Sequence, residues 1–150
     1  MNLYAETSAV VAWLLDEERG DRAWSQLVAA DTVHTSDLTL IECDRTFRRG
    51  SLTGRLTASE SVRLQAILDT ASAHWTLYAM DAEIVHRSRR SFPREPVRTL
   101  DAIHLATVLA VRNLAPDVKV LSFDDRIRQN AASLGFPVAP DAVAAPRTHS

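Results

Sequence analysis

The sequence predicts one α/β domain in which a mostly parallel central sheet carries helices on both faces. Short apolar runs alternate along the chain with segments whose apolar residues recur at helical spacing, a pattern typical of parallel strands joined by helices. The 150 residues, 46% of them hydrophobic, suit one globular core that needs no disulfide. No internal repeat or linker-like stretch interrupts residues 1–138, so we expect a single domain there.

The first half of the chain begins with a short apolar strand over residues 2–5. Thr7 and Ser8 can cap the helix that follows, and Gly20 is expected to break it. The remaining elements of this half are a helix at 22–29, a strand at 33–35, a helix from a cap at 36 or 37 to before Gly50, and a helix from the capping box at 57–60 to about 73.

The second half is expected to alternate in the same way. Two prolines forbid a continuous helix over residues 92–96, and Thr99 can cap the most apolar helix of the chain. The expected strands are 75–80, 118–123 and an edge strand at 136–138, and the expected helices are 81–91, 100–114 and one from Asp124 or Asp125 to Gly135. Residues 139–150 have no periodicity and are expected to form a loose tail.

The cysteine content and the lengths of the apolar segments indicate the cellular compartment. Cys43 is the single cysteine, which excludes an intramolecular disulfide and fits a reducing compartment. The first residues do not resemble a signal peptide, and no apolar stretch approaches the roughly 20 residues of a membrane span. We therefore expect a cytoplasmic protein with no membrane partner.

The arrangement of basic residues says more than the net charge of −2. Lys119 is the only lysine, and arginines gather at residues 45–55 and again at 87–98. The planar guanidinium suits phosphate better than an ammonium does, so these clusters are compatible with a nucleic-acid substrate. Two solvated helix faces are the simpler interpretation and stay open.

Two acidic residues directly follow predicted strands. Glu6 follows the first strand, and Asp124 follows the strand that ends at Phe123. In open parallel sheets, ligands bind beyond the carboxyl ends of the strands. Neither junction has a glycine-rich phosphate loop, so these crossovers offer carboxylates, which favour a hard cation.

Two more acids lie in apolar helices: Asp101 near the start of one, and Glu42 inside another. Each acid also has a structural explanation. Asp124 can be a helix cap, Asp101 a first-turn acid, and Glu42 part of an exposed face. Glu6 is harder to explain in this way, because glutamate caps helices poorly and a carboxylate beside a buried strand needs a partner. His104, one turn after Asp101, can orient it or be a core residue.

Together these residues resemble the PIN domain, and in particular VapC-like toxins of toxin–antitoxin pairs. Four segments carry the resemblance in the family's order: Glu6-Thr7-Ser8-Ala9, the run from Thr35 to Glu42, Leu100 to Ala106, and Ser122-Phe123-Asp124. Glu6 departs from the family's aspartate, and its extra methylene moves the carboxylate by about 1.5 Å.

The resemblance implies a three-layer PIN-like fold over residues 1–138 and a Mg²⁺- or Mn²⁺-dependent endoribonuclease. It implies Glu6, Glu42, Asp101 and Asp124 as catalytic residues, with Glu6, Asp101 and Asp124 as metal ligands. Substrate contacts are expected from Thr7, Ser8 and Arg98. The implied partners are RNA, a cognate antitoxin encoded nearby and a second copy of the chain.

Three alternatives stay open at this point. A degenerate PIN domain would bind RNA or a partner without cutting. A receiver-like phosphoacceptor domain would need a lysine just after a late strand, but Lys119 lies within the predicted strand. A plain interaction module would use all four acids as helix caps.

Overall fold

The computed structural model describes residues 1–142, which form a five-stranded, wholly parallel sheet. Its strands are β1 (Asn2–Ala5), β2 (Thr32–Ser36), β3 (Thr76–Tyr78), β4 (Lys119–Leu121) and β5 (Val138–Ala139). Their order across the sheet is β3-β2-β1-β4-β5, so β1 lies in the centre and pairs with β2 and β4. The carboxyl ends of the central strands β1 and β4 therefore lie side by side.

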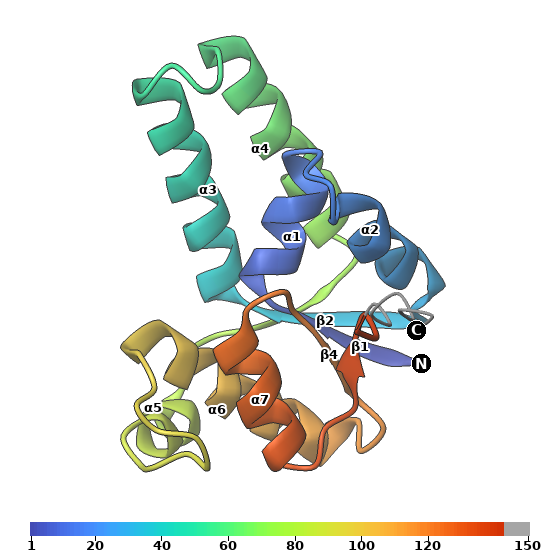
Figure 1. The fold of residues 1–150 in the computed structure, drawn as a ribbon, viewed down its shortest axis with the longest axis vertical. Coiled ribbons are helices and arrows are strands. Elements are labelled where there is room, and N and C mark those ends of the chain that lie inside the picture. The colour runs from blue at the N-terminus through green and yellow to red at the C-terminus, as the bar shows by residue number, and fades with distance from the viewer. Residues whose placement is uncertain (143–150) are drawn as a thin grey trace, which may run out of the picture.

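Helices cover both faces of the sheet, which confirms the three-layer prediction (Figure 1). One face carries α1 (Thr7–Leu14), α2 (Gly20–Ala29), α3 (Asp37–Leu52) and α4 (Ala58–Ser72); the other carries α5 (Ala82–Ser88), α6 (Thr99–Leu114) and α7 (Asp125–Ser133). Side chains alternate along β1 accordingly. Leu3 and Ala5 belong to the first core, and Tyr4 belongs to the second.

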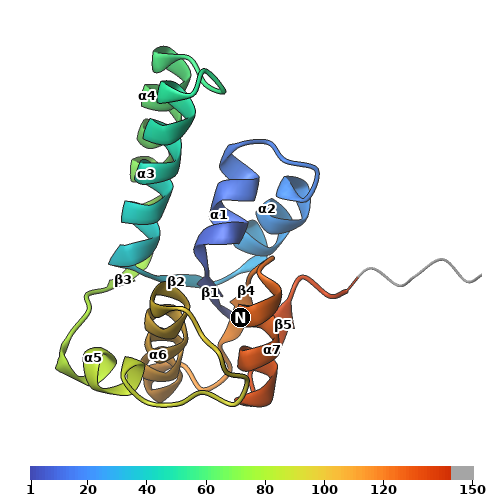
Figure 2. The ribbon, with the colours of Figure 1, turned by 60° about the vertical axis from the view of Figure 1, so that its left-hand side comes forward.

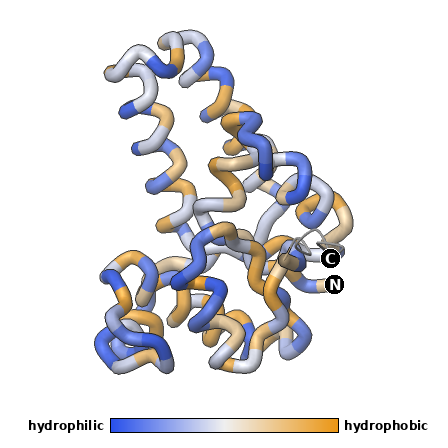
Figure 3. Tube along the Cα trace, viewed as in Figure 1, coloured by the Kyte–Doolittle hydropathy of each residue, from blue (hydrophilic) through white to orange (hydrophobic). Residues whose placement is uncertain are grey.

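Helices α3 and α4 pair into an arm that projects from the sheet (Figure 2). Hydrophilic and hydrophobic residues alternate along this arm (Figure 3). Cys43 and Phe47 face the core from α3, and Leu64 and Leu68 face it from α4. The exposed side chain of Leu52 lies at the end of α3.

Two glycines act differently from the prediction. The first helix ends at Leu14, and Gly20 is the first residue of α2 rather than the breaker of α1. A Cβ at Gly20 would lie 2.5 Å from the carbonyl oxygen of Ala12, so glycine is needed there for close packing of α2 on α1. Helix α3 runs through Gly50 to Leu52, because packing overrides the weak helix propensity of one glycine.

The last strand begins two residues later and ends one residue later than the predicted 136–138, because it is Val138–Ala139. Ala139 is buried in β5, and Arg128 donates hydrogen bonds to the carbonyl oxygens of Ala139 and Pro140. Contacts thus continue past residue 138, where the loose tail was predicted to begin. Residues 143–150, the rest of that predicted tail, lie outside the described residues. Within residues 1–142, none of the helices combines the length and the apolar character of a membrane span.

Candidate active site

All seven residues that the sequence singles out as site residues line one cavity of about 400 Å³. The cavity opens at the carboxyl ends of β1 and β4, between α1 and α3 on one face of the sheet and α6 and α7 on the other. Its lining comprises Glu6, Thr7, Ser8, Val11, Glu42, Arg98, Thr99, Leu100, Asp101 and Asp124. Four carboxylates from four separate segments therefore share one hollow.

Glu6 continues β1 and is held by hydroxyl groups. Its backbone N–H donates to the carbonyl oxygen of Leu121, which extends the β1–β4 pairing by one residue. The side chain is 5% exposed, and its Oε2 accepts hydrogen bonds from Ser8 Oγ at 2.5 Å and Ser122 Oγ at 2.6 Å. These two donors offset part of the cost of burying a carboxylate.

The predicted capping of α1 by Thr7 or Ser8 is wrong. Glu6 occupies the N-cap position, and no side chain makes a capping hydrogen bond there. Instead, the Thr7 hydroxyl donates to Glu42 Oε1 at 2.7 Å, and the Ser8 hydroxyl donates to Glu6. Both hydroxyls are used to hold acids. Their direct contact with substrate stays a prediction.

Glu42 lies on α3 and is held by a buried chain of polar groups. His104 Nε2 lies 2.7 Å from Glu42 Oε1, and His104 Nδ1 lies 2.9 Å from the Tyr4 hydroxyl. Because a carboxylate only accepts, Nε2 carries the proton. Burial alone raises the pKa of Glu42, but the hydrogen bond and charge of His104 and the bond from Thr7 outweigh it, so the pKa lies below its usual value. His104 therefore orients Glu42, not Asp101.

Asp124 follows β4 and is the N-cap of α7. Its Oδ1 accepts hydrogen bonds from the backbone N–H groups of Arg126 and Ile127, and its own N–H donates to Ser122 Oγ. The cap expected at Asp124 or Asp125 is thus at Asp124. Capping fixes the direction of the carboxylate and leaves its second oxygen for the cavity.

Asp101 lies in the first turn of α6. The N-cap of this helix is Arg98, which makes no side-chain capping bond, so the predicted cap at Thr99 is wrong. Burial, followed by the negative charges of Asp124 and Glu6, raises the pKa of Asp101. This upward shift is the electrostatic sign that the acids face one another.

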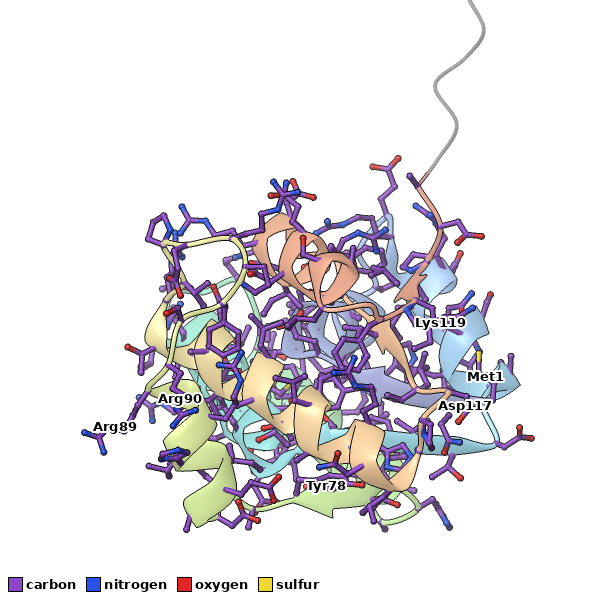
Figure 4. The ribbon with its side chains drawn as sticks, turned by 90° about the horizontal axis from the view of Figure 1, so that it is seen from below. Met1, Tyr78, Arg89, Arg90, Asp117 and Lys119 are labelled. Carbon is purple, nitrogen blue, oxygen red and sulfur yellow. The ribbon has the colours of Figure 1, made fainter. Side chains whose placement is uncertain are left out.

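The arginine clusters contribute little to this cavity. Only Arg98 of the second cluster lines it. Arg89 and Arg90 are exposed and point outward at the edge of the molecule (Figure 4). Most of the clustered arginines therefore lie on solvated surfaces, as the simpler interpretation holds.

Within residues 1–142, no three His, Cys, Asp or Glu side chains lie close enough to ligate one ion together. Glu6, Asp101 and Asp124 share the cavity without forming a closed cage. The donor set still fits Mg²⁺ or Mn²⁺, because Mg²⁺ is usually held through one or two carboxylates and keeps several waters. Burial raises the pKa of Asp101 most, and the charges of Asp124 and Glu6 add to the shift, so a cation bound here would favour its ionised form.

Sequence reasoning assigned no role to Ser122 or Tyr4 and expected another partner for His104. Ser122 bonds Glu6 and accepts from the N–H of Asp124, so it joins two of the acids. Its signal was a hydroxyl residue two positions before Asp124. Tyr4 had no signal, because an aromatic residue in a buried strand predicts only core packing.

Comparisons with known proteins agree with this geometry. A family model of the PIN domain matches residues 3–133. The chain is 32% identical over 138 residues to Ribonuclease VapC35 of Mycobacterium tuberculosis (strain ATCC 25618 / H37Rv), an alignment that covers 91% of this chain and 94% of the relative.

Solved structures agree on the fold. VapC20 of Mycobacterium tuberculosis, described as a sarcin-ricin loop cleaving toxin, superposes with a TM-score of 0.60 at 20% identity and covers 89% of this chain and 95% of its own. A chain of a toxin–antitoxin complex from Klebsiella pneumoniae gives a TM-score of 0.64 at 16% identity, covering 95% and 100%. At these identities the structural likeness shows the fold alone.

Asp101→Asn is expected to stabilise the metal-free protein at pH 7. The pKa of Asp101 is raised by folding, so its ionisation disfavours the folded state, and that penalty grows as pH rises through the raised pKa. The melting temperature of Asp101→Asn should exceed that of the wild type by a few degrees at pH 7, and the gain should fade towards pH 4. Asp125→Asn, which removes a first-turn acid outside this cavity, should give no gain. A gain that grows as pH falls would contradict the repulsion.

His104→Leu is expected to raise the pKa of Glu42, because the substitution removes its hydrogen bond and nearby charge while burial remains. Carbon-13 NMR titration of the glutamate carboxyls measures this directly. Tyr4→Phe is the matched control, since it keeps the His104–Glu42 bond and should shift Glu42 less. An unchanged Glu42 titration in His104→Leu would show that the bond has no hold on this acid.

Proposed function

The chain belongs to the PIN domain family, and from that membership and its carboxylate cavity we propose that it is a metal-dependent endoribonuclease acting as the toxin of a toxin–antitoxin pair. The observation that carries the proposal is the meeting of Glu6, Glu42, Asp101 and Asp124 in one cavity at the carboxyl edge of the sheet. A cavity with this charge repels an RNA phosphate unless a cation is present, which is why we expect activity to require Mg²⁺ or Mn²⁺.

In this proposal the acids have different roles. Asp101, Asp124 and Glu6 hold the cation, which when bound supplies a reactive water and stabilises charge on the phosphate. Glu42 keeps its charge through His104 and Thr7 and can accept a proton from the attacking water. Arg98, at the rim, contacts the flanking RNA backbone.

Glu6 replaces the aspartate of the family pattern, and its hydroxyl partners support a working site. Ser8 and Ser122 both bond Oε2, and Oε1 has no protein partner among the described residues. The longer side chain is therefore fixed at one oxygen, and the other can serve the cation. Glu6→Asp should keep or raise activity if the position is used as in the family.

The partner we propose is a small antitoxin with an amphipathic helix. The toxin–antitoxin complex among the structural neighbours supports such a partner. An apolar hollow of about 440 Å³ lies between α1, α2 and α4, where Trp13 and Trp24 stack with ring centroids 5.0 Å apart and Ile67 lines the wall. Trp24 is 46% exposed, more than a core tryptophan would be. Ile41 on α3 is also exposed.

A basic side chain of the antitoxin would complete the inhibition by entering the acidic cavity, where charge-assisted bonds are strong. The homodimer implied by the resemblance stays a prediction, and exposed Leu77, Met80 and Val85 beside the edge strand β3 offer it an apolar surface. A cytoplasmic location, where RNA and antitoxin are both present, completes the proposal.

The activity is tested with single-stranded RNA in Mg²⁺, in Mn²⁺ and in chelator. The wild type should cut only with metal, because the cavity needs a cation before it can accept a phosphate. Asp101→Asn and Glu6→Gln should lower cleavage by about a hundredfold or more, since loss even of groups that only orient metal ligands costs 10–100-fold. Glu60→Gln, an exposed first-turn acid of α4 that lies outside the cavity, is the matched control.

Equal cleavage in chelator would sink the metal-dependent mechanism. Absence of cleavage with any RNA and metal, together with retained RNA or partner binding, would favour the degenerate PIN domain. If Glu6→Asp destroys activity, Glu6 does not correspond to the aspartate of the family pattern.

The toxin role is tested in cells. The wild type expressed alone should arrest growth, whereas co-expression with the neighbouring small open reading frame or the substitution Asp101→Asn should restore it. The neighbour should co-purify with both forms, because its docking hollow does not include Asp101. A lone wild type that cuts RNA in vitro but leaves growth unaffected would indicate a housekeeping ribonuclease instead.

A further inference from the structure

A second cavity lies at the same edge of the sheet, beyond the ends of β4 and β5. Its volume is about 240 Å³, and its lining includes Arg19, Arg22, Phe123 and Arg128. It adjoins the acidic cavity through consecutive residues, since Phe123 lines the one and Asp124 the other. The Phe123 N–H donates to Ser8 Oγ at 2.8 Å, and Ser8 holds Glu6. The two cavities are therefore neighbours at this edge of the sheet.

The central feature of this cavity is a stacked pair. The guanidinium carbon of Arg19 lies 4.6 Å from the centroid of the Phe123 ring. Arg19 is exposed, and its one ion pair, to Glu17 at 3.8 Å, is solvent-screened and weak. A guanidinium plane held on an aromatic ring presents a flat surface on which an unpaired nucleobase can stack.

Two further arginines of this cavity are held by backbone carbonyl oxygens and not by carboxylates. Arg22 donates to the carbonyl oxygen of Asp141, and Arg128 donates to the carbonyl oxygens of Ser122, Ala139 and Pro140. Within residues 1–142 the ion pairs are Met1–Asp31, Arg19–Glu17 and His104–Glu42, so neither arginine is paired with a carboxylate. The lining itself holds three guanidinium groups and the carboxylates of Asp125 and Asp141, and Glu17, which pairs with Arg19, lies outside it.

From these contacts we infer that the second cavity is a subsite for the nucleotide that flanks the cleaved phosphodiester. The Arg19–Phe123 pair stacks the unpaired base, and Arg19 and Arg22 attract its phosphate. The inference rests on the proposed ribonuclease function, since it needs the RNA backbone to lie over the acids. It predicts a preference for single-stranded or looped RNA, because a paired base has no free face for this surface.

The test is equilibrium binding of a short fluorescein-labelled single-stranded RNA in the presence of Mg²⁺, followed by anisotropy. Each substitution is made in a Glu42→Gln background, which removes the proposed proton acceptor to prevent cutting and keeps the proposed cation ligands Glu6, Asp101 and Asp124. Arg19→Ala should weaken binding about fivefold to tenfold and lower the salt-dependence slope by about 0.7 for the lost phosphate contact. Arg19→Lys should keep the slope but recover only part of the affinity, because it keeps the charge and loses the plane.

Phe123→Leu should weaken binding of the single strand about fivefold and leave binding of a duplex of the same sequence unchanged, because stacking needs an unpaired base. Arg48→Ala is the matched control, an exposed arginine on α3 that lines neither cavity. Arg22 is not substituted, since it also bonds the backbone at Asp141.

The outcomes separate the subsite from the activity. If Arg19→Ala and Phe123→Leu bind RNA as Arg48→Ala does, the subsite is wrong even if the wild type cuts RNA. If binding depends on Arg19 and Phe123 but the wild type cuts no RNA, the subsite stands and the proposed activity fails. If the Glu42→Gln parent with Mg²⁺ binds no RNA, both are wrong.

Discussion

The placing of Asp101 beside the carboxylates of Glu6 and Asp124 in a partly buried pocket is the constraint on which the site depends. A parallel sheet brings the carboxyl ends of β1 and β4 together, and Glu6 and Asp124 follow those ends. Burial, followed by the negative charges of these two acids, raises the pKa of Asp101, so its ionised form is costly here. The fold meets this cost locally, with serine hydroxyls on Glu6, backbone N–H groups on Asp124, and His104 and Thr7 on Glu42.

These supports also divide the acids into two kinds. Glu42 has a lowered pKa and a fixed partner, so it keeps its charge without a cation. Asp101 has a raised pKa and no such partner, so its charge is costly until a cation arrives. One pocket thus holds an acid ready to accept a proton beside acids that attract a metal, which is the division of roles that hydrolysis of a phosphodiester requires.

Sequence patterns predicted the parts of this arrangement that depend on neighbouring residues. Strand ends located Glu6 and Asp124, the alternation of elements predicted the three layers, and an apolar helix located Asp101. Contacts between distant segments were not predictable in this way. The residues around His104 and around Glu42 do not predict that the two side chains meet. Their contact depends on how α6 and α3 pack in the folded protein. The role predicted for Gly20 was wrong for the same reason. Glycine is required at this position because of its close contact with Ala12 on another helix.

The central claim is that this cavity binds a divalent cation through its acids. The most direct measurement is a crystal structure of the protein soaked with Mn²⁺, in which anomalous scattering locates the ion independently of any assay. The account predicts a Mn²⁺ peak in the cavity within coordination distance of Asp101 and at least one of Glu6 and Asp124, and loss of that peak in Asp101→Asn. A fully soaked crystal with no peak in this cavity, or with Mn²⁺ only at other surface acids, would contradict it.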